Sequence, residues 1–246
     1  MAPLHELLTP PLLLAVAVAA AAGVIRGITG FGGAMVMTPP LALIFGPKLA
    51  VPVVLLLETF AATPMLREAV ATARWRMITP MFVAACLTVP LGGYLLVSAD
   101  PDVLRRAIAV IVIVFSLLLL NGVRYSGPQH LSTSIALGGV SGTMLGATSI
   151  GAPPVILYLL SGPDAVRVTR ANLTLYVVVT SGAGLAMLWS RGLLDGASLL
   201  SGLALAPFFY GGVAAGSRLF SRFSDLRFRQ FTLLLMTVVS LGVLLA

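Results

Sequence analysis

The chain has 246 residues, of which 59% are hydrophobic and only 9% are charged, and its formal net charge is +7. A soluble domain usually carries about a quarter of its residues as charged ones, so this composition excludes an ordinary soluble protein. Long apolar stretches recur along the whole chain, and a helix needs about 20 such residues to cross a bilayer. They are too long for barrel strands and show little two-residue alternation. We therefore predict an all-α polytopic membrane protein embedded in the lipid bilayer.

Ten apolar segments follow one another along the chain. No basic residues precede the first, as they would in a signal peptide, so we expect the stretch from Leu12 to Ala22 to be a mature first helix. The segments span residues 11–28, 31–45, 50–66, 77–97, 103–121, 131–145, 147–161, 168–190, 198–215 and 227–246. Two pairs of short segments, 11–28 with 31–45 and 131–145 with 147–161, flank glycine-rich breaks. Each pair is either two tilted helices or a re-entrant hairpin.

The two glycine-rich breaks indicate an internal repeat. The first is GITGFGGAMVMTPPLAL, starting at Gly27, and the second is GTMLGATSIGAPPVILYLL, starting at Gly142. A shift of 116 residues aligns Gly30 with Gly146 and also aligns the Gly-Pro pairs that follow the breaks. We therefore divide the single membrane domain into a first repeat, 1–125, and a second repeat, 126–246.

The basic residues of the loops predict how the two repeats are oriented. Lys and Arg accumulate in short loops on the cytoplasmic side of a membrane. Ten Lys or Arg residues lie in the connections 67–76, 121–130, 162–170 and 216–229. Equivalent loops then fall on opposite sides, which predicts inverted repeats in a bacterial inner membrane with both termini in the periplasm. The positive charge is explained by this bias and by lipid headgroups, so no nucleic-acid partner is expected.

Broken helices in inverted repeats are typical of secondary transporters, which bind substrate where the breaks meet. A helix that restarts after a break presents unpaired backbone amides and attracts anions. The expected contacts to a small anionic substrate are Gly30, Phe31, Gly32, Gly33, Gly146, Thr148, Ser149 and Gly151. The alternative is that the glycines serve close helix packing, which we prefer for the ridge formed by Gly138, Gly142 and Gly146.

Charged residues inside apolar segments are costly and usually face a partner or a substrate path. Arg26, four residues before the first break, is a candidate anion ligand; the alternative is a salt bridge to Glu58 or snorkelling to the interface. Glu58 is the candidate carboxylate for a coupling ion, either a proton or sodium. Arg170 and Asn172 complete the candidate site, although Arg170 serves equally well as a headgroup anchor.

The two glycine-rich stretches resemble those of a known protein family. The sequence GITGFGGAMVMTPPLAL, with the second and degenerate GATSIGAPPVILYLLSGPD, resembles the TauE/SafE family of membrane permeases, also called sulfite exporters. The resemblance implies an ion-driven permease for small anions such as sulfite or organosulfonates. Many members repeat Gly-x-Gly-Gly in the second break, whereas this chain has Ala-Thr-Ser there. The resemblance therefore does not fix which anion this chain binds.

The residues that an intramembrane enzyme or a metal site would need are not found in this sequence. An enzyme in the membrane needs a nucleophile–base pair or metal ligands, and we find neither, so we expect no catalysis, no metal and no cofactor. The single cysteine, Cys86, forms no intrachain disulfide. A passive anion channel, or a carrier for a short carboxylate, is the alternative function. The pair Gly212 and Gly216 serves a homodimer contact or internal packing equally well.

Overall fold

The computed structural model describes residues 10–63, 66–123, 130–162, 164–219 and 240–245, with the single positions 125, 127, 234, 237 and 238. These residues are almost entirely helical and contain no strand, which confirms the all-α class. In chain order the helices are α2 (Pro10–Thr29), α3 (Gly33–Phe45), α4 (Pro47–Ala62), α5 (Leu66–Thr72), α6 (Trp75–Ser98), α7 (Pro101–Leu120), α8 (Leu131–Thr148), α9 (Ala152–Leu159), α10 (Val166–Ser190) and α11 (Gly196–Leu219).

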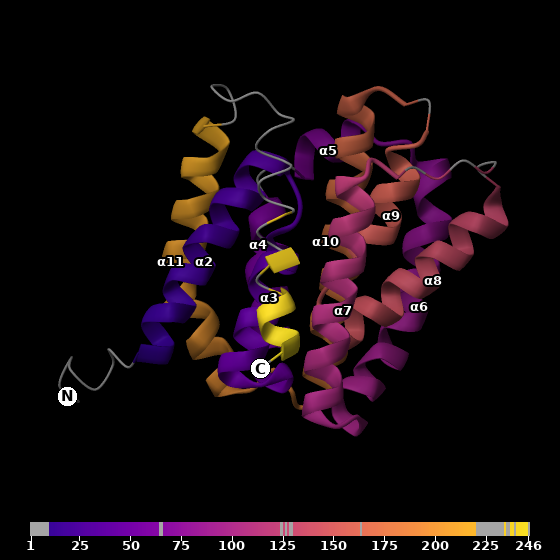
Figure 1. Cartoon of the computed structure of the whole chain (residues 1–246). Coiled ribbons are helices and arrows are strands. Elements are labelled where there is room, and N and C mark those ends of the chain that lie inside the picture. The colour runs from indigo at the N-terminus through magenta and orange to yellow at the C-terminus, as the bar shows by residue number, and fades with distance from the viewer. Residues whose placement is uncertain are drawn as a thin grey trace.

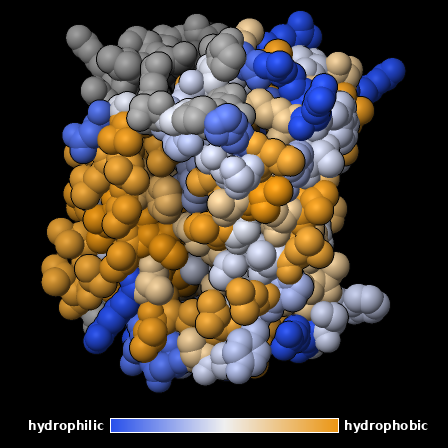
Figure 2. Space-filling view, turned by 90° about the vertical axis from the view of Figure 1, so that its right-hand side faces the viewer, coloured by the Kyte–Doolittle hydropathy of each residue, from blue (hydrophilic) through white to orange (hydrophobic). Residues whose placement is uncertain are grey.

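Five of the described helices are long and apolar enough to cross a membrane, namely α2, α6, α7, α10 and α11. Their surfaces remain apolar, because side chains such as Leu87, Leu203 and Trp189 are largely exposed. In Figure 2 apolar side chains cover the middle of the molecule, and hydrophilic ones gather toward the upper and lower ends. The polytopic membrane architecture predicted from composition is thereby confirmed.

Several helix boundaries differ from those predicted. The segment predicted at 50–66 is α4, which begins at Pro47 after Gly46 and ends at Ala62, and the short helix α5 lies mostly in the predicted connection 67–76. Proline is favoured at the first position of a helix because it has no amide hydrogen to leave unpaired. The segment limits place the second break at Gly146, but α8 continues to Thr148 and the break covers residues 149–151, inside the predicted glycine-rich stretch. The predicted segment 227–246 lies mostly outside the described residues.

Glycines hold two pairs of helices in close contact, α6 with α8 and α2 with α11. A Cβ on Gly142 would overlap the carbonyl oxygen of Ala85, and one on Gly146 would overlap that of Val89. In the other pair, a Cβ on Gly216 would overlap the carbonyl oxygen of Val24. Such backbone contacts are the usual role of small residues in membrane helix pairs.

The other member of the candidate dimer motif also packs inside the molecule. A Cβ on Gly212 would overlap the carbonyl oxygen of Ala20 in α2. Gly212 and Gly216 therefore both face α2. Of the two roles considered for this motif, the structure shows internal helix packing.

Each of the two glycine-packed helix pairs joins one helix of the first predicted repeat to one helix of the second. The first helix of repeat 1, α2, packs against α11 of repeat 2, and the first helix of repeat 2, α8, packs against α6 of repeat 1. In Figure 1 the α2–α11 pair lies on the left, the α6–α8 pair lies on the right, and α3, α4 and α10 lie between them. Helix α2 rises through this view while α8 descends. These directions are those expected of an inverted repeat, which stays a prediction.

Two ion pairs bring basic connections together at one end of the molecule. Arg74, at the start of α6, pairs with Asp164, and Arg167 pairs with Glu68 at 2.9 Å. The connections 67–76 and 162–170 therefore share a side, as the loop charges predict.

The packing role of the α8 glycines can be tested with two alanines on the same helix. Gly142→Ala should lower the folded yield and the melting temperature, because its methyl group would collide with backbone of α6. Gly139→Ala is the matched control, since a Cβ there meets only the Thr88 methyl group at 3.7 Å, and alanine favours the helix by up to about 1 kcal/mol. Equal yields and melting temperatures for the two variants would contradict the packing role.

The orientation can be tested with single cysteines in a Cys86→Ser background. Arg167→Cys and Asp102→Cys place thiols on exposed positions of loops predicted to face opposite sides. In intact cells a membrane-impermeant maleimide should label only position 102, and after permeabilisation it should label both. Labelling of both positions in intact cells would contradict the predicted topology.

Candidate anion-binding site

Each helix break is built from residues in the left-handed backbone region. In the first break, Gly30 and Gly32 have φ of 77° and 89°, and α3 begins directly after them at Gly33. Glycine adopts this conformation without the steric cost that other residues meet. In the second break Ser149 has φ of 60°, the only positive φ of a non-glycine among the described residues, and Gly151 precedes α9.

The two breaks line one cavity. Its volume is about 40 Å³, which is room for a few water-sized groups, since one water needs about 10–15 Å³ by this measure. The first break contributes Phe31 and Gly32, and the second contributes Ser149 and Gly151. Helix α10 completes the wall with polar side chains, and α2 and α4 contribute one charged residue each: the further polar lining residues are Arg26, Glu58, Tyr176, Thr180 and Ser181.

Hydroxyl groups connect the second break to its surroundings. The hydroxyls of Ser149 and Thr38 in α3 are hydrogen-bonded at 2.9 Å, which joins the second break to the helix that follows the first. Ser141 of α8 donates to the carbonyl oxygen of Gly151 and accepts from the Tyr176 hydroxyl at 2.7 Å. The positions of the breaks relative to each other are therefore fixed by side chains from α3, α8 and α10.

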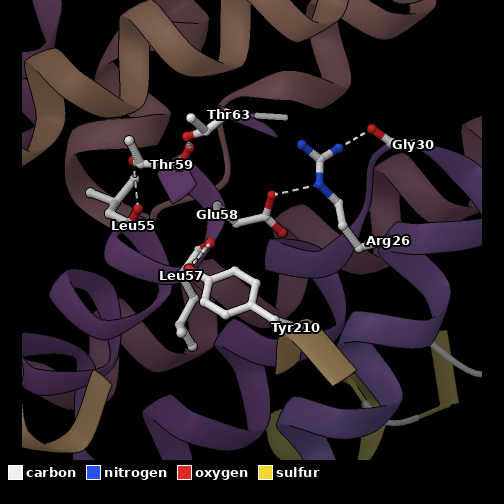
Figure 3. A network of polar contacts seen from close by, with 8 residues as sticks. All are labelled: Arg26, Gly30, Leu55, Leu57, Glu58, Thr59, Thr63 and Tyr210. Atoms are coloured by element: carbon white, nitrogen blue, oxygen red, sulfur yellow. Dashed lines mark hydrogen bonds and ion pairs between the residues drawn. The ribbon is translucent and has the colours of Figure 1, made fainter. Parts of the chain in front are cut away.

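A buried ion pair lies at the first break. Arg26 Nε is 3.0 Å from Glu58 Oε2, and both residues are more than nine-tenths buried. Arg26 Nη1 also donates to the carbonyl oxygen of Gly30, so one guanidinium joins α4 to the break (Figure 3). The salt bridge considered as an alternative role for Arg26 is thus present. It does not remove Arg26 from the cavity wall.

The second oxygen of the Glu58 carboxylate points at the start of α3. Glu58 Oε1 is buried and has no hydrogen-bond partner among the described residues. A Cβ added to Gly33 would overlap this oxygen. Glycine at position 33 therefore makes room for the carboxylate beside the first turn of α3.

Arg170 stands between this cavity and the basic end of the molecule. Its Nη2 atom lies 3.6 Å from the position that a Cβ of Gly30 would take. Arg170 also lines a second, larger cavity of about 260 Å³, together with Glu68, Arg167 and Thr174. The side chain of Arg170 thus adjoins both the first break and the larger cavity.

Five residues predicted for the site are not in the lining of either cavity: Gly30, Gly33, Gly146, Thr148 and Asn172. Gly30 and Gly33 lie directly beside Arg170 and Glu58, respectively. Gly146 packs against α6, as described above. Thr148 ends α8, and its hydroxyl donates to the Met144 carbonyl at 2.7 Å. Asn172 is fully buried and accepts the backbone amide of Arg74 at 2.9 Å, so it caps the start of α6.

Several polar residues at the site were not predicted from the sequence. The pair Thr180 and Ser181 interrupts an apolar run of α10, and this was the one available signal for them. The other missed residues that line or support the cavity are Thr38, Ser141 and Tyr176. No group of three metal-ligating side chains occurs among the described residues.

A multi-pass helical protein whose two broken helices enclose a polar cavity has the architecture of a membrane transporter. The family model described as sulfite exporter TauE/SafE matches residues 15–243 of this chain. The chain therefore belongs to the TauE/SafE family, whose members are membrane transporters rather than enzymes. No curated protein and no solved structure matches it.

The buried pair predicts a specific pattern of stability. Arg26→Ala should lower the free energy of unfolding by about 3–5 kcal/mol, because it leaves the Glu58 carboxylate buried without its partner. Combining Arg26→Ala with Glu58→Ala should recover most of that loss. The exposed pair of Arg167 and Glu68 is the control, and its removal should change thermal unfolding little. A double variant at positions 26 and 58 as unstable as the singles would contradict this account.

Proposed function

We propose that the protein is a secondary transporter that moves a small sulfur-containing oxyanion, such as sulfite or an organosulfonate, across the bacterial inner membrane. The observation that carries the proposal is that both helix breaks and the buried Arg26 line one cavity. Family membership supports transport of sulfite or a related anion.

The donors around the cavity suit an oxyanion. A guanidinium presents several N–H groups in one plane and pairs well with two oxygens of one anion. The start of α3 adds backbone amides with positive partial charge. The hydroxyls of Ser149, Thr180 and Ser181 add polar groups to the lining, and that of Thr180 would donate to an anion after leaving the Tyr176 carbonyl. A tetrahedral or pyramidal sulfur oxyanion presents oxygens to several of these groups at once.

The larger cavity supports an entry route from the basic end. Arg167 and Arg170 line it against a single carboxylate, Glu68. A cleft with an excess of one charge sign raises the local concentration of the opposite ion. Since Arg170 adjoins Gly30, it is placed to pass an anion from this cavity toward the break.

Glu58 favours a coupled carrier over a passive channel. A buried carboxylate in an anion path repels the permeating ion, and a channel has no use for such a barrier. In a carrier the same group binds a coupling ion, a proton or sodium, whose gradient drives the anion. We extend the proposal to the topology, with the basic loops in the cytoplasm and both termini in the periplasm.

Anion-dependent thermal stability tests the proposal. The purified protein is melted with sulfite, methanesulfonate, sulfate and acetate, and a ligand that binds only the native state stabilises it in proportion to the logarithm of its concentration above its Kd. Sulfite or the sulfonate should raise the melting temperature most. Arg26→Lys should reduce that rise, because lysine keeps the charge but loses the planar donor array.

Arg191→Lys is the matched control, at an exposed arginine at the end of α10, and it should retain the full rise. A rise with acetate alone would favour the carboxylate carrier. A protein that responds to none of the sulfur oxyanions would refute the proposed function.

A further inference from the structure

The carboxylate of Glu58 occupies the place where the cavity is best suited to an anion. Its Oε2 contacts the guanidinium of Arg26 at 3.0 Å. Its Oε1 is buried, lacks a hydrogen-bond partner in the described part of the chain, and lies against Gly33 at the start of α3. Figure 3 shows the carboxylate between α4 and Arg26. One internal anion thus takes both attractive features, the guanidinium and the helix start.

A substrate oxyanion needs the same two features. A second cation beside the first break, Arg170, lines the other cavity and not this one. An oxyanion inside the break cavity therefore competes with Glu58 for Arg26.

The charge balance of the cavity decides the outcome of this competition. Arg26 and Glu58 together are neutral when both are ionised. An added oxyanion leaves one negative charge uncompensated, and an unpaired charge in a buried site costs several kcal/mol. One proton on Glu58 restores neutrality, because it leaves Arg26 paired with the oxyanion alone.

Among the groups that surround Glu58, only its own carboxylate can accept the proton. Arg26 of α2 is a guanidinium and has no acceptor for a further proton. From α11, the Tyr210 hydroxyl donates to the Leu57 carbonyl at 3.1 Å, and from α10, Tyr176 lines the same cavity and donates to Ser141. Both phenols are already neutral. Helix α3 carries no titratable residue.

The remaining neighbours of α4 add no charge to this site. Helices α6, α7 and α8 also contact α4, and within the described chain they place no acidic or basic side chain in the lining of the break cavity.

We propose that Glu58 is an internal substitute for the substrate, displaced from Arg26 when an oxyanion binds and protonated in the same event. A monovalent oxyanion binds, the ion pair opens, and Glu58 takes one proton from the buffered solution; release of the anion returns that proton and restores the pair. This inference rests on the proposed function and identifies its coupling ion, since each anion moves with one proton.

Titration calorimetry with methanesulfonate tests the exchange. A sulfonate stays ionised across the working pH range, so proton uptake reports the protein. Measured in sodium-free buffers of different ionisation enthalpy, the parent should take up about one proton per anion bound. Its Kd should rise by up to about tenfold per pH unit where Glu58 is ionised. Glu58→Gln should bind without proton uptake, at least as tightly as the parent, and with a Kd independent of pH.

Two variants serve as controls. Asp102→Asn changes an exposed carboxylate at the opposite end of the molecule, and Tyr210→Phe removes the phenol beside Glu58; both should keep the proton uptake of the parent. If Glu58→Gln does not fold, the uptake by the parent alone decides.

Three results would overturn the inference. Sulfonate binding by the parent without proton uptake, or only in the presence of sodium, would refute it and leave the proposed function standing. A folded Glu58→Gln variant that no longer binds would show that the carboxylate is needed for binding rather than displaced. Absence of sulfonate binding in every variant, together with no thermal response to sulfite, would refute the proposed function together with the inference.

Discussion

The ion pair between Arg26 and Glu58 is the interaction on which the centre of the molecule depends. It joins the end of α2 to α4, and the same guanidinium holds the Gly30 carbonyl, which fixes the chain where α2 stops. A buried pair of this kind adds little stability compared with well-packed apolar side chains. Apolar residues would thus satisfy the packing equally well. The presence of two charges at this position is better explained by the binding and release of an ion than by stability.

Close packing of glycines gives this centre a rigid frame. The pairs α2–α11 and α6–α8 are in backbone contact through their glycines, so these four helices have little freedom to separate. Arg26 stands at the end of α2, which belongs to this frame, whereas Glu58 lies on α4. The breaks are held by individual polar contacts such as that of Ser149 with Thr38. We expect any rearrangement during transport to occur in these polar contacts, because they cost less to exchange than the glycine contacts.

The sequence predicted the class of fold well because lipid imposes it, since low charge and long apolar runs allow few folds other than a helical bundle. The first break was also placed correctly at its glycines, because Gly30 and Gly32 adopt positive φ. The prolines Pro39 and Pro40 that follow lie inside α3 and do not interrupt it. The second break lies inside the predicted glycine-rich stretch, but α8 continues past Gly146 to Thr148 and the chain turns at Ser149. Gly146 has the packing role that we preferred for it from the sequence, since a Cβ there would overlap the Val89 carbonyl oxygen of α6. Asn172, Ser141 and Tyr176 show why composition alone does not assign polar roles, since each depends on a partner distant in the sequence.

The central claim is that one anion binds where the two breaks meet, in contact with Arg26. Anomalous diffraction from crystals grown with 2-bromoethanesulfonate tests this claim most directly, because bromine marks the ligand without relying on any substitution. We predict a bromine peak in the cavity lined by Phe31 and Ser149, with the sulfonate beside the Arg26 guanidinium. A peak confined to the outer cavity beside Glu68 and Arg167, with none between the breaks, would contradict the account.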